Sequence, residues 1–145
     1  MATLLKVHKE NKKEDEGKEM SMTPEYIRDM LFYFQDAAHK FHQDTTDGWE
    51  HDAMGKLYEK LVGFKDDIPE ELMGYLGGKR LKGLNKIDIP DYKSKQDSIK
   101  LCNEIIGFAY ELYEWSGEKK YCDIENKAQD LSGVAAQTIY RLSLN

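Results

Sequence analysis

The stretch GYLGGKRLKGLNKIDIPDYK, residues 74–93, decides the fold. It contains Gly74, Gly77, Gly78, Gly83 and Pro90 and has no sustained apolar period, so it predicts a long connection rather than a helix or strand. Such connections are uncommon inside compact domains. A helical bundle requires one when its second and third helices run parallel, because the chain must return along the bundle first. The stretch therefore favours a four-helix bundle with a long crossover between the second and third helices.

Two helices are predicted before this connection, at residues 24–43 and 49–67, from apolar residues spaced three and four apart. The first begins at Thr23 as the cap and Pro24 at the first helical position. Turn-forming residues at 44–48 separate the two helices. Pro69 interrupts the second pattern, so this helix either kinks there or gives way to a short separate helix. Its apolar stripe consists of Ala53, Met54, Leu57, Tyr58, Leu61 and Phe64.

Two further helices are predicted after the connection, at residues 95–116 and 123–143. Ser94 and Asp123 are the expected N-terminal caps, and Ser116 and Gly117 the expected end of the third helix. The predicted stripe of the fourth helix consists of Ile124, Ala128, Leu131, Ala135, Thr138 and Leu142.

Composition indicates one domain and excludes several classes of function. A chain of 145 residues with 40% apolar residues can build one core, which we place in residues 21–145 after a disordered leader at residues 1–20. The net charge of −6 argues against nucleic acid as a partner. No apolar stretch is long enough to span a membrane and no signal peptide is evident, so we expect a cytoplasmic protein. Two widely separated cysteines indicate neither a zinc site nor a disulfide framework.

The stretch AHKFHQDTTDGWEHDAMGKLYEKLVGFKDDIPEELMG, residues 38–74, resembles the Dps-like branch of the ferritin superfamily. The likeness is closest to ferritin-like small proteins encoded by some bacteriophages. That branch has a His on its first helix, a His near the start of the second, and later an Asp and a Glu four residues apart. His39, His51, Asp66 and Glu70 match these separations, and His42 replaces His39 in a shifted alignment. The resemblance implies a ferritin-like four-helix bundle.

The same resemblance implies an iron site shared between subunits, with His39 or His42 and His51 from one chain and the acidic pair from its two-fold mate. Imidazole and carboxylate ligands suit Fe(II). This sequence has Gly55 where the family has a further carboxylate, and Pro69 intrudes between Asp66 and Glu70, so the site looks degenerate. The alternative is that the histidines are ordinary polar or partly buried residues at helix ends. Because Asp is a better helix residue than Gly, we expect Gly55→Asp to cost little stability.

A classical ferritin centre within one chain is excluded. That centre needs Glu-x-x-His on two helices, and all four histidines of this chain lie in its first third. The predicted third and fourth helices therefore have no histidine to contribute.

A second candidate site lies in the connection, where basic side chains surround glycines. Flexible glycine backbone beside cations can hold a phosphate-bearing ligand, although the spacing fits no phosphate-loop signature, and a solvated loop is the alternative. The candidate residues are Lys79, Arg80, Lys82 and Lys86.

Two functions follow as hypotheses. The first is a Dps-like homodimer or larger homo-oligomer that binds iron and is at most a weak ferroxidase. The second is a non-catalytic, phage-type accessory protein of the host cytoplasm, which binds a host protein or a phosphate-bearing small molecule.

Overall fold

Four long α-helices account for most of residues 22–144, the part of the chain that the computed structural model describes. They are α2 (Pro24–Asp44), α3 (Gly48–Tyr75), α4 (Lys95–Lys119) and α5 (Cys122–Leu142). No strand occurs in residues 22–144, so the predicted all-α class with four helices is confirmed. The predicted leader, residues 1–20, lies outside the described residues, as do residues 21 and 145.

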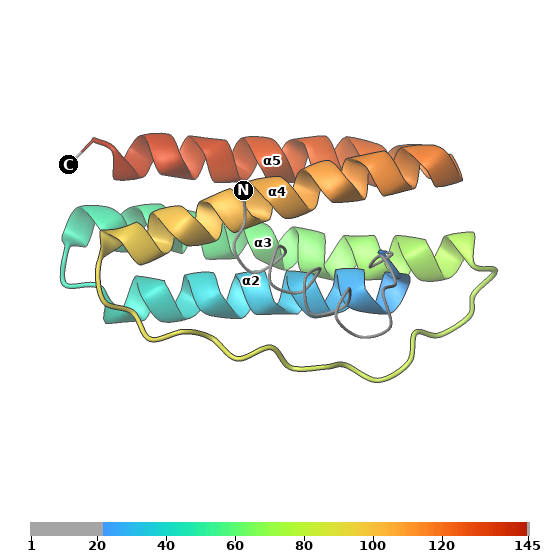
Figure 1. Cartoon of the computed structure of the whole chain (residues 1–145), viewed down its shortest axis with the longest axis horizontal. Coiled ribbons are helices and arrows are strands. Elements are labelled where there is room, and N and C mark those ends of the chain that lie inside the picture. Colours follow the sequence, from blue (N-terminus) through green and yellow to red (C-terminus); the bar gives the residue numbers. More distant parts are fainter. Residues whose placement is uncertain (1–21, 145) are drawn as a thin grey trace, which may run out of the picture.

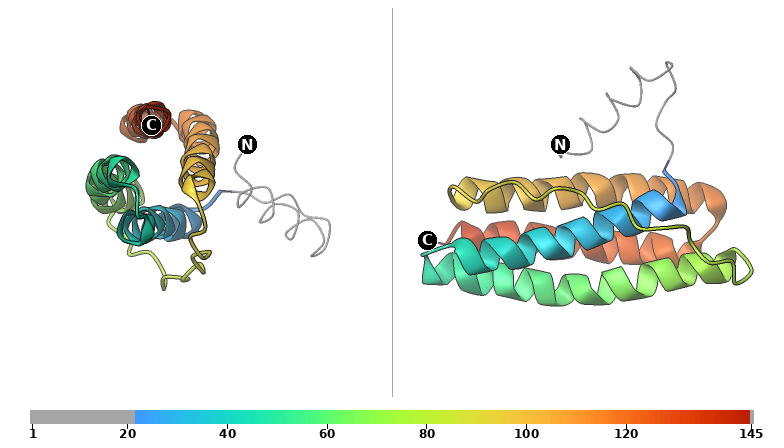
Figure 2. Two further views of the ribbon diagram at one scale, coloured as in Figure 1. Left: turned by 90° about the vertical axis from the view of Figure 1, so that its left-hand side faces the viewer. Right: turned by 90° about the horizontal axis from the view of Figure 1, so that it is seen from below.

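The helices form a square bundle when it is seen from one end (Figure 2). α2 packs beside α3 and α4, and α5 packs beside the same two helices. Helices that are neighbours in the square run antiparallel, whereas α3 and α4 lie on a diagonal and run in the same direction (Figure 1). The connecting segment, residues 76–94, joins the end of α3 to the start of α4 and returns along the outside of the bundle (Figure 1).

Polar contacts hold the connecting segment against α2. The backbone amide of Asn85 donates to Asp29 Oδ1 at 3.0 Å, and the Arg28 guanidinium donates to the carbonyl oxygen of Lys82. Further along, apolar side chains of the segment pack on the core, at Ile87, Ile89 and Tyr92. The segment therefore has a defined course although it contains no helix.

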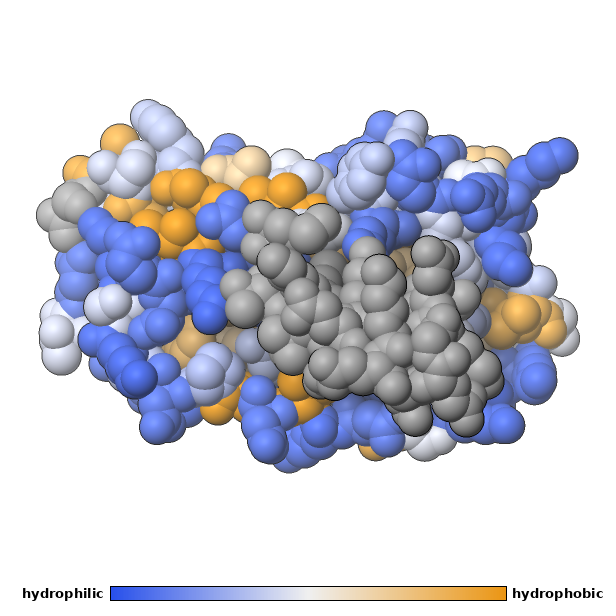
Figure 3. All heavy atoms as spheres, in the orientation of Figure 1, coloured by the Kyte–Doolittle hydropathy of each residue, from blue (hydrophilic) through white to orange (hydrophobic). Residues whose placement is uncertain are grey.

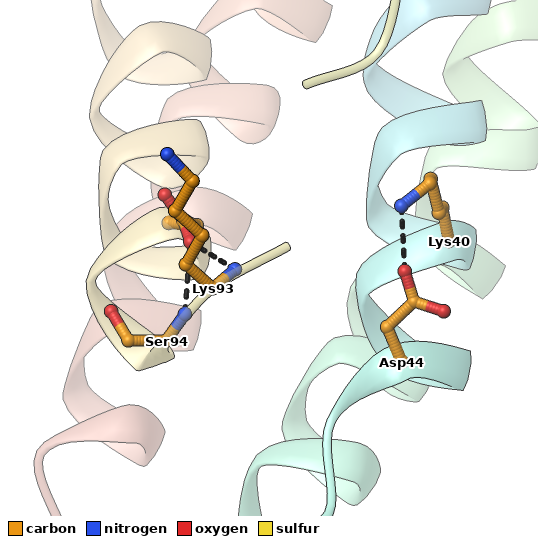
Figure 4. A network of polar contacts seen from close by, with 5 residues as sticks. Lys40, Asp44, Lys93 and Ser94 are labelled. Atoms are coloured by element: carbon orange, nitrogen blue, oxygen red, sulfur yellow. Dashed lines mark hydrogen bonds and ion pairs between the residues drawn. The ribbon is translucent and has the colours of Figure 1, made fainter. Parts of the chain in front are cut away.

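Two predicted caps are confirmed at the helix starts. Thr23 Oγ1 accepts from the Tyr26 amide at 3.1 Å, and Ser94 forms a capping box with Asp97. The amides of Lys93 and Ser94 donate to the Asp97 carboxylate at 2.7 and 2.9 Å (Figure 4). The same view includes the exposed ion pair between Lys40 and Asp44, one turn apart at the end of α2 (Figure 4).

Two other predicted ends are wrong. Asp123 does not cap α5, because the helix begins one residue earlier, at Cys122, and the Asp123 carboxylate pairs with Lys127 at 2.9 Å instead. α4 continues past Gly117 to Lys119 and ends where Lys120 adopts the left-handed conformation with φ of 63°.

Pro69 lies inside α3, so the alternative of a separate short helix is excluded. Its ring nitrogen has no hydrogen to donate to the carbonyl of Lys65. Ile68 and Pro69 are nevertheless buried, and the helix continues to Tyr75. Burial of this segment compensates for the missing hydrogen bond.

The core lies along the axis of the bundle and contains the predicted apolar stripes. Phe34 of α2 and Phe108 of α4 meet edge to face with ring centroids 5.3 Å apart. All six predicted stripe residues of α5 are buried, whereas Tyr58 and Phe64 of the predicted α3 stripe are only partly buried. Burial of these faces is what binds the four helices together.

The surface is mostly polar on the face seen in Figure 3, with an apolar patch over α4 and α5 at its upper left. None of the helices in residues 22–144 is long and apolar enough to cross a membrane.

Candidate functional site

Three histidines gather where α2 turns into α3. His42 of α2 and His51 of α3 stack with ring centroids 3.8 Å apart and planes 21° from parallel. His39 lies further from His42, at 6.3 Å between centroids, and stacks on Tyr58 at 4.4 Å. The turn at 45–47 brings the ends of the two helices together, and its Asp47 side chain caps α3 by accepting from the Trp49 amide.

The stacked pair is locked by two reciprocal hydrogen bonds. His42 Nδ1 donates to the carbonyl oxygen of His51 at 2.7 Å, and His51 Nδ1 donates to the carbonyl oxygen of His42 at 2.8 Å. Because a carbonyl oxygen only accepts, Nδ1 carries the hydrogen in both rings. In the neutral form of each ring the lone pair is therefore on Nε2, the arrangement by which a backbone carbonyl orients a metal-binding imidazole.

Gly55 is part of this cluster because the His42 ring lies directly over it. A Cβ atom built at Gly55 would come within 3.0 Å of His42 Cε1 and Nδ1. Any side chain at this position therefore requires the His42 ring to shift by a few tenths of an ångström, a contact that the sequence does not reveal. The ring fills the place where the resemblance implies a carboxylate.

The acidic pair lies well away from the histidines of the same chain. Asp66 and Glu70 are exposed on α3, and Asp66 is about 22 Å along the helix axis from His51 at about 1.5 Å per residue. Within residues 22–144 no group of three or more His, Cys, Asp or Glu side chains is placed to hold one metal ion. Pro69 does not disconnect the pair, because both residues belong to the same helix.

The basic side chains of the connecting segment do not converge on a backbone cradle. Gly77 and Gly78 have positive φ angles, and their amides donate to the carbonyls of Gly74 and Met73 at the end of α3. Arg80 donates back to the carbonyl of Gly78 at 2.8 Å. The glycines therefore terminate a helix, and the phosphate-site prediction depends on exposed side chains alone, those of Lys79, Arg80, Lys82 and Lys86.

A buried carboxylate that the sequence analysis missed lies beside the histidine turn. Glu50, in the first turn of α3, is 2% exposed. Its Oε1 accepts from Thr45 Oγ1 at 3.0 Å and from the Tyr92 hydroxyl at 2.7 Å, and its Oε2 accepts from Ser98 Oγ at 2.6 Å. Burial and the Glu50 carboxylate raise the pKa of Tyr92.

This carboxylate joins the turn at 45–47, the end of the connecting segment and the start of α4. Three hydroxyl donors and the positive end of α3 satisfy its charge. A signal for it exists in the sequence, because Glu50 precedes Ala53, Met54 and Leu57 at helical spacing and so lies on the apolar stripe.

A comparison with protein families gives the chain's relationship. Residues 42–142 match the model of DUF5856, a family of unknown function. The chain belongs to this family. The match includes His42, His51, Asp66 and Glu70 and leaves out His39. Among curated proteins and among solved structures, none matches the chain.

Proposed function

We propose that this DUF5856 protein binds a divalent metal ion, iron in the first instance, between two copies of the chain. The observation that carries the proposal is the locked histidine pair, whose carbonyl hydrogen bonds leave the Nε2 lone pair of each neutral ring for a ligand. His51 is exposed, so its imidazole is accessible. Imidazole with carboxylate is a ligand set that suits Fe(II).

One side of α3 carries both kinds of ligand. Eleven residues make about three helical turns, so Val62 lies on the same side as His51. Asp66 and Glu70 follow Val62 at steps of about one turn and lie about 60° and about 100° round the helix from His51. All four side chains are exposed. The side is therefore a surface on which a second copy can pack.

Two-fold symmetry can bring the His51 imidazole of one chain to the acidic pair of the other. If two α3 helices cross antiparallel between Lys60 and Leu61, His51 of one chain is level with the partner's Glu70. In the same register Gly55 is level with the partner's Asp66. Val62 lies close to this crossing point and is 45% exposed, which gives the pair an apolar contact at its centre. Iron bound there would be oxidised slowly at most, because Gly55 has no carboxylate to contribute to the site.

The test combines subunit number with metal affinity. Light scattering on the purified protein should give a dimer or larger oligomer, and anaerobic calorimetry should detect Fe(II) binding. His51→Ala and Asp66→Ala should each weaken binding about tenfold or more, since each removes a ligand. Asp67→Ala is the matched control, because Asp67 is also exposed but faces a different side of α3.

A mixing experiment then tests whether the ligands come from different chains. When the His51→Ala and Asp66→Ala chains are unfolded together and refolded, mixed dimers contain one site with both ligands. A fraction of the sites in the mixture should then bind Fe(II) with the affinity of the unmodified protein, although both parents bind it weakly. A monomeric protein, or a mixture as inactive as its parents, would refute the shared site.

A second candidate function is a non-catalytic accessory role, with a host protein or a phosphate-bearing molecule as the ligand. The observation that favours it is the His42 ring over Gly55, which uses the position of the missing carboxylate for packing. A folded oligomer without Fe(II) affinity would support this second function over the first.

A further inference from the structure

A hollow of about 220 Å³ opens where the start of α3 meets the end of α5. Figure 1 places these two helix ends at the same end of the bundle. The hollow faces α5, whereas His51 faces α2, so it is separate from the proposed metal site. Its lining consists of Trp49, Asp52, Ala53, Lys56, Arg141 and Leu144.

Two cations in this hollow have no acidic partner in the described chain. Arg141 is half-buried and Lys56 is exposed, and within residues 22–144 neither side chain forms an ion pair or hydrogen bond. Asp52 lies one turn before Lys56 on α3 and does not pair with it. None of the Arg141 side-chain nitrogens is a buried donor without a partner, so the guanidinium is open to a ligand, and carboxylate and phosphate are the groups that match its donors.

The rest of the lining is apolar and includes a large aromatic ring. Trp49 is 52% exposed although it is one of the largest side chains in the protein. Ala53 and Leu144 complete an apolar wall. The volume corresponds to about seven water molecules at about 30 Å³ each, which is room for one small ring with a substituent. Cations beside an aromatic wall are a combination that recognises planar organic anions.

We propose that this hollow binds a small organic anion, with Arg141 and Lys56 on its single anionic group and Trp49 against its planar apolar body. The anionic group is a carboxylate or a phosphate. Arg141 contributes the fork of donors that matches either group in a bidentate manner. Asp52 on the rim adds a negative charge that disfavours ligands with further anionic groups. The inference does not depend on the proposed metal site.

The test uses the indole N–H signals of Trp49 and Trp115 in an NMR titration of the full chain. Benzoate, phenyl phosphate and neutral benzyl alcohol serve as probes, so the first two distinguish a carboxylate from a phosphate ligand. Trp115 is an internal control, because it packs against Tyr121 with centroids 5.7 Å apart, away from the hollow. Saturable movement of the Trp49 signal alone, with an anionic probe and not with benzyl alcohol, is the expected result.

Two substitutions should change the affinity in opposite directions. Arg141→Gln should weaken binding of the preferred probe about tenfold or more, because a charge-assisted hydrogen bond is lost. Asp52→Asn should tighten it about twofold to fivefold, because a nearby like charge is removed. Lys100→Gln, at an exposed position of α4, should leave it unchanged.

Three outcomes would overturn the proposal. They are joint movement of the Trp49 and Trp115 signals, binding of benzyl alcohol as tight as that of benzoate, and retention of the original affinity by Arg141→Gln. Should Arg141→Gln fail to fold, Asp52→Asn decides the matter, since unchanged or weaker binding in that variant contradicts an anion site.

Discussion

Replacement of Glu50 by Ala should destabilise the protein more than any other single change to its ionisable groups. The carboxylate accepts three hydroxyl hydrogen bonds, from Thr45, Tyr92 and Ser98, and it is almost fully buried. Each hydrogen bond to a charged group contributes about 1.5–3 kcal/mol, and such contributions overlap within one network. We therefore expect Glu50→Ala to lower the free energy of unfolding by about 3–5 kcal/mol. For a chain of this size that loss lowers the melting temperature by roughly 10 °C.

Urea unfolding followed by circular dichroism measures this loss, with Glu59→Ala as the matched control. Glu59 is exposed on the same helix, so its removal should change stability by less than about 0.5 kcal/mol. Glu50→Gln preserves the shape and one acceptor and should cost about 1–2 kcal/mol. In a double-mutant cycle Tyr92→Phe should cost much less in the Glu50→Ala background than alone. Equal stability of Glu50→Ala and Glu59→Ala would show that the network contributes nothing.

Two further predictions concern single positions. Gly55→Ala should destabilise the protein by about 1 kcal/mol because its Cβ displaces His42. Gly63→Ala, in open space on the same helix, should stabilise it by about 0.5–1 kcal/mol. Urea unfolding midpoints compare the two variants, and a stabilising Gly55→Ala would contradict the contact. Burial raises the pKa of Asp97, but the amides of Ser94 and Lys93 outweigh it, so the folded-state pKa lies below the ordinary 3.8. The stability that the ionised Asp97 carboxylate contributes is complete above pH 3.8 and is lost as pH falls through the folded-state pKa. In a plot of the free energy of unfolding against pH, Asp97→Asn should therefore flatten the acid limb. An unchanged limb would contradict the cap.

The elements that sequence predicted well are those that depend on neighbours within one or two turns. Thr23 and Ser94 cap their helices through amides two or three residues away, so local pattern identifies them. Local pattern could not decide whether the helix continues through Pro69, because the cost of the missing backbone hydrogen bond is outweighed by burial of this segment. Asp123 was misplaced as a cap because α5 begins one residue earlier than its composition suggests.

The geometry of the candidate site depends on contacts between different helices, which local sequence patterns do not predict. The stack of His42 on His51 joins two helices across a turn, and only the turn's geometry determines that the rings meet. Gly55 looked like a lost ligand and is instead the space in which the His42 ring packs. The hollow beside Arg141 requires the relative placement of α3 and α5, which no local pattern specifies. Glu50 alone carried a readable signal, a charge at a stripe position.

The course of the connecting segment divides the molecule into two helical hairpins. α2 packs with α3 and α4 packs with α5 through contacts that are near in sequence, so each hairpin can form early and independently. The segment between them covers the outside of α2 and does not pass through the core. Because the connecting segment links the two hairpins, its length determines the effective concentration of one hairpin for the other during folding. A shorter or longer segment would change that effective concentration. Chain continuity thus determines how fast the halves find each other, while the buried faces determine how firmly they stay joined.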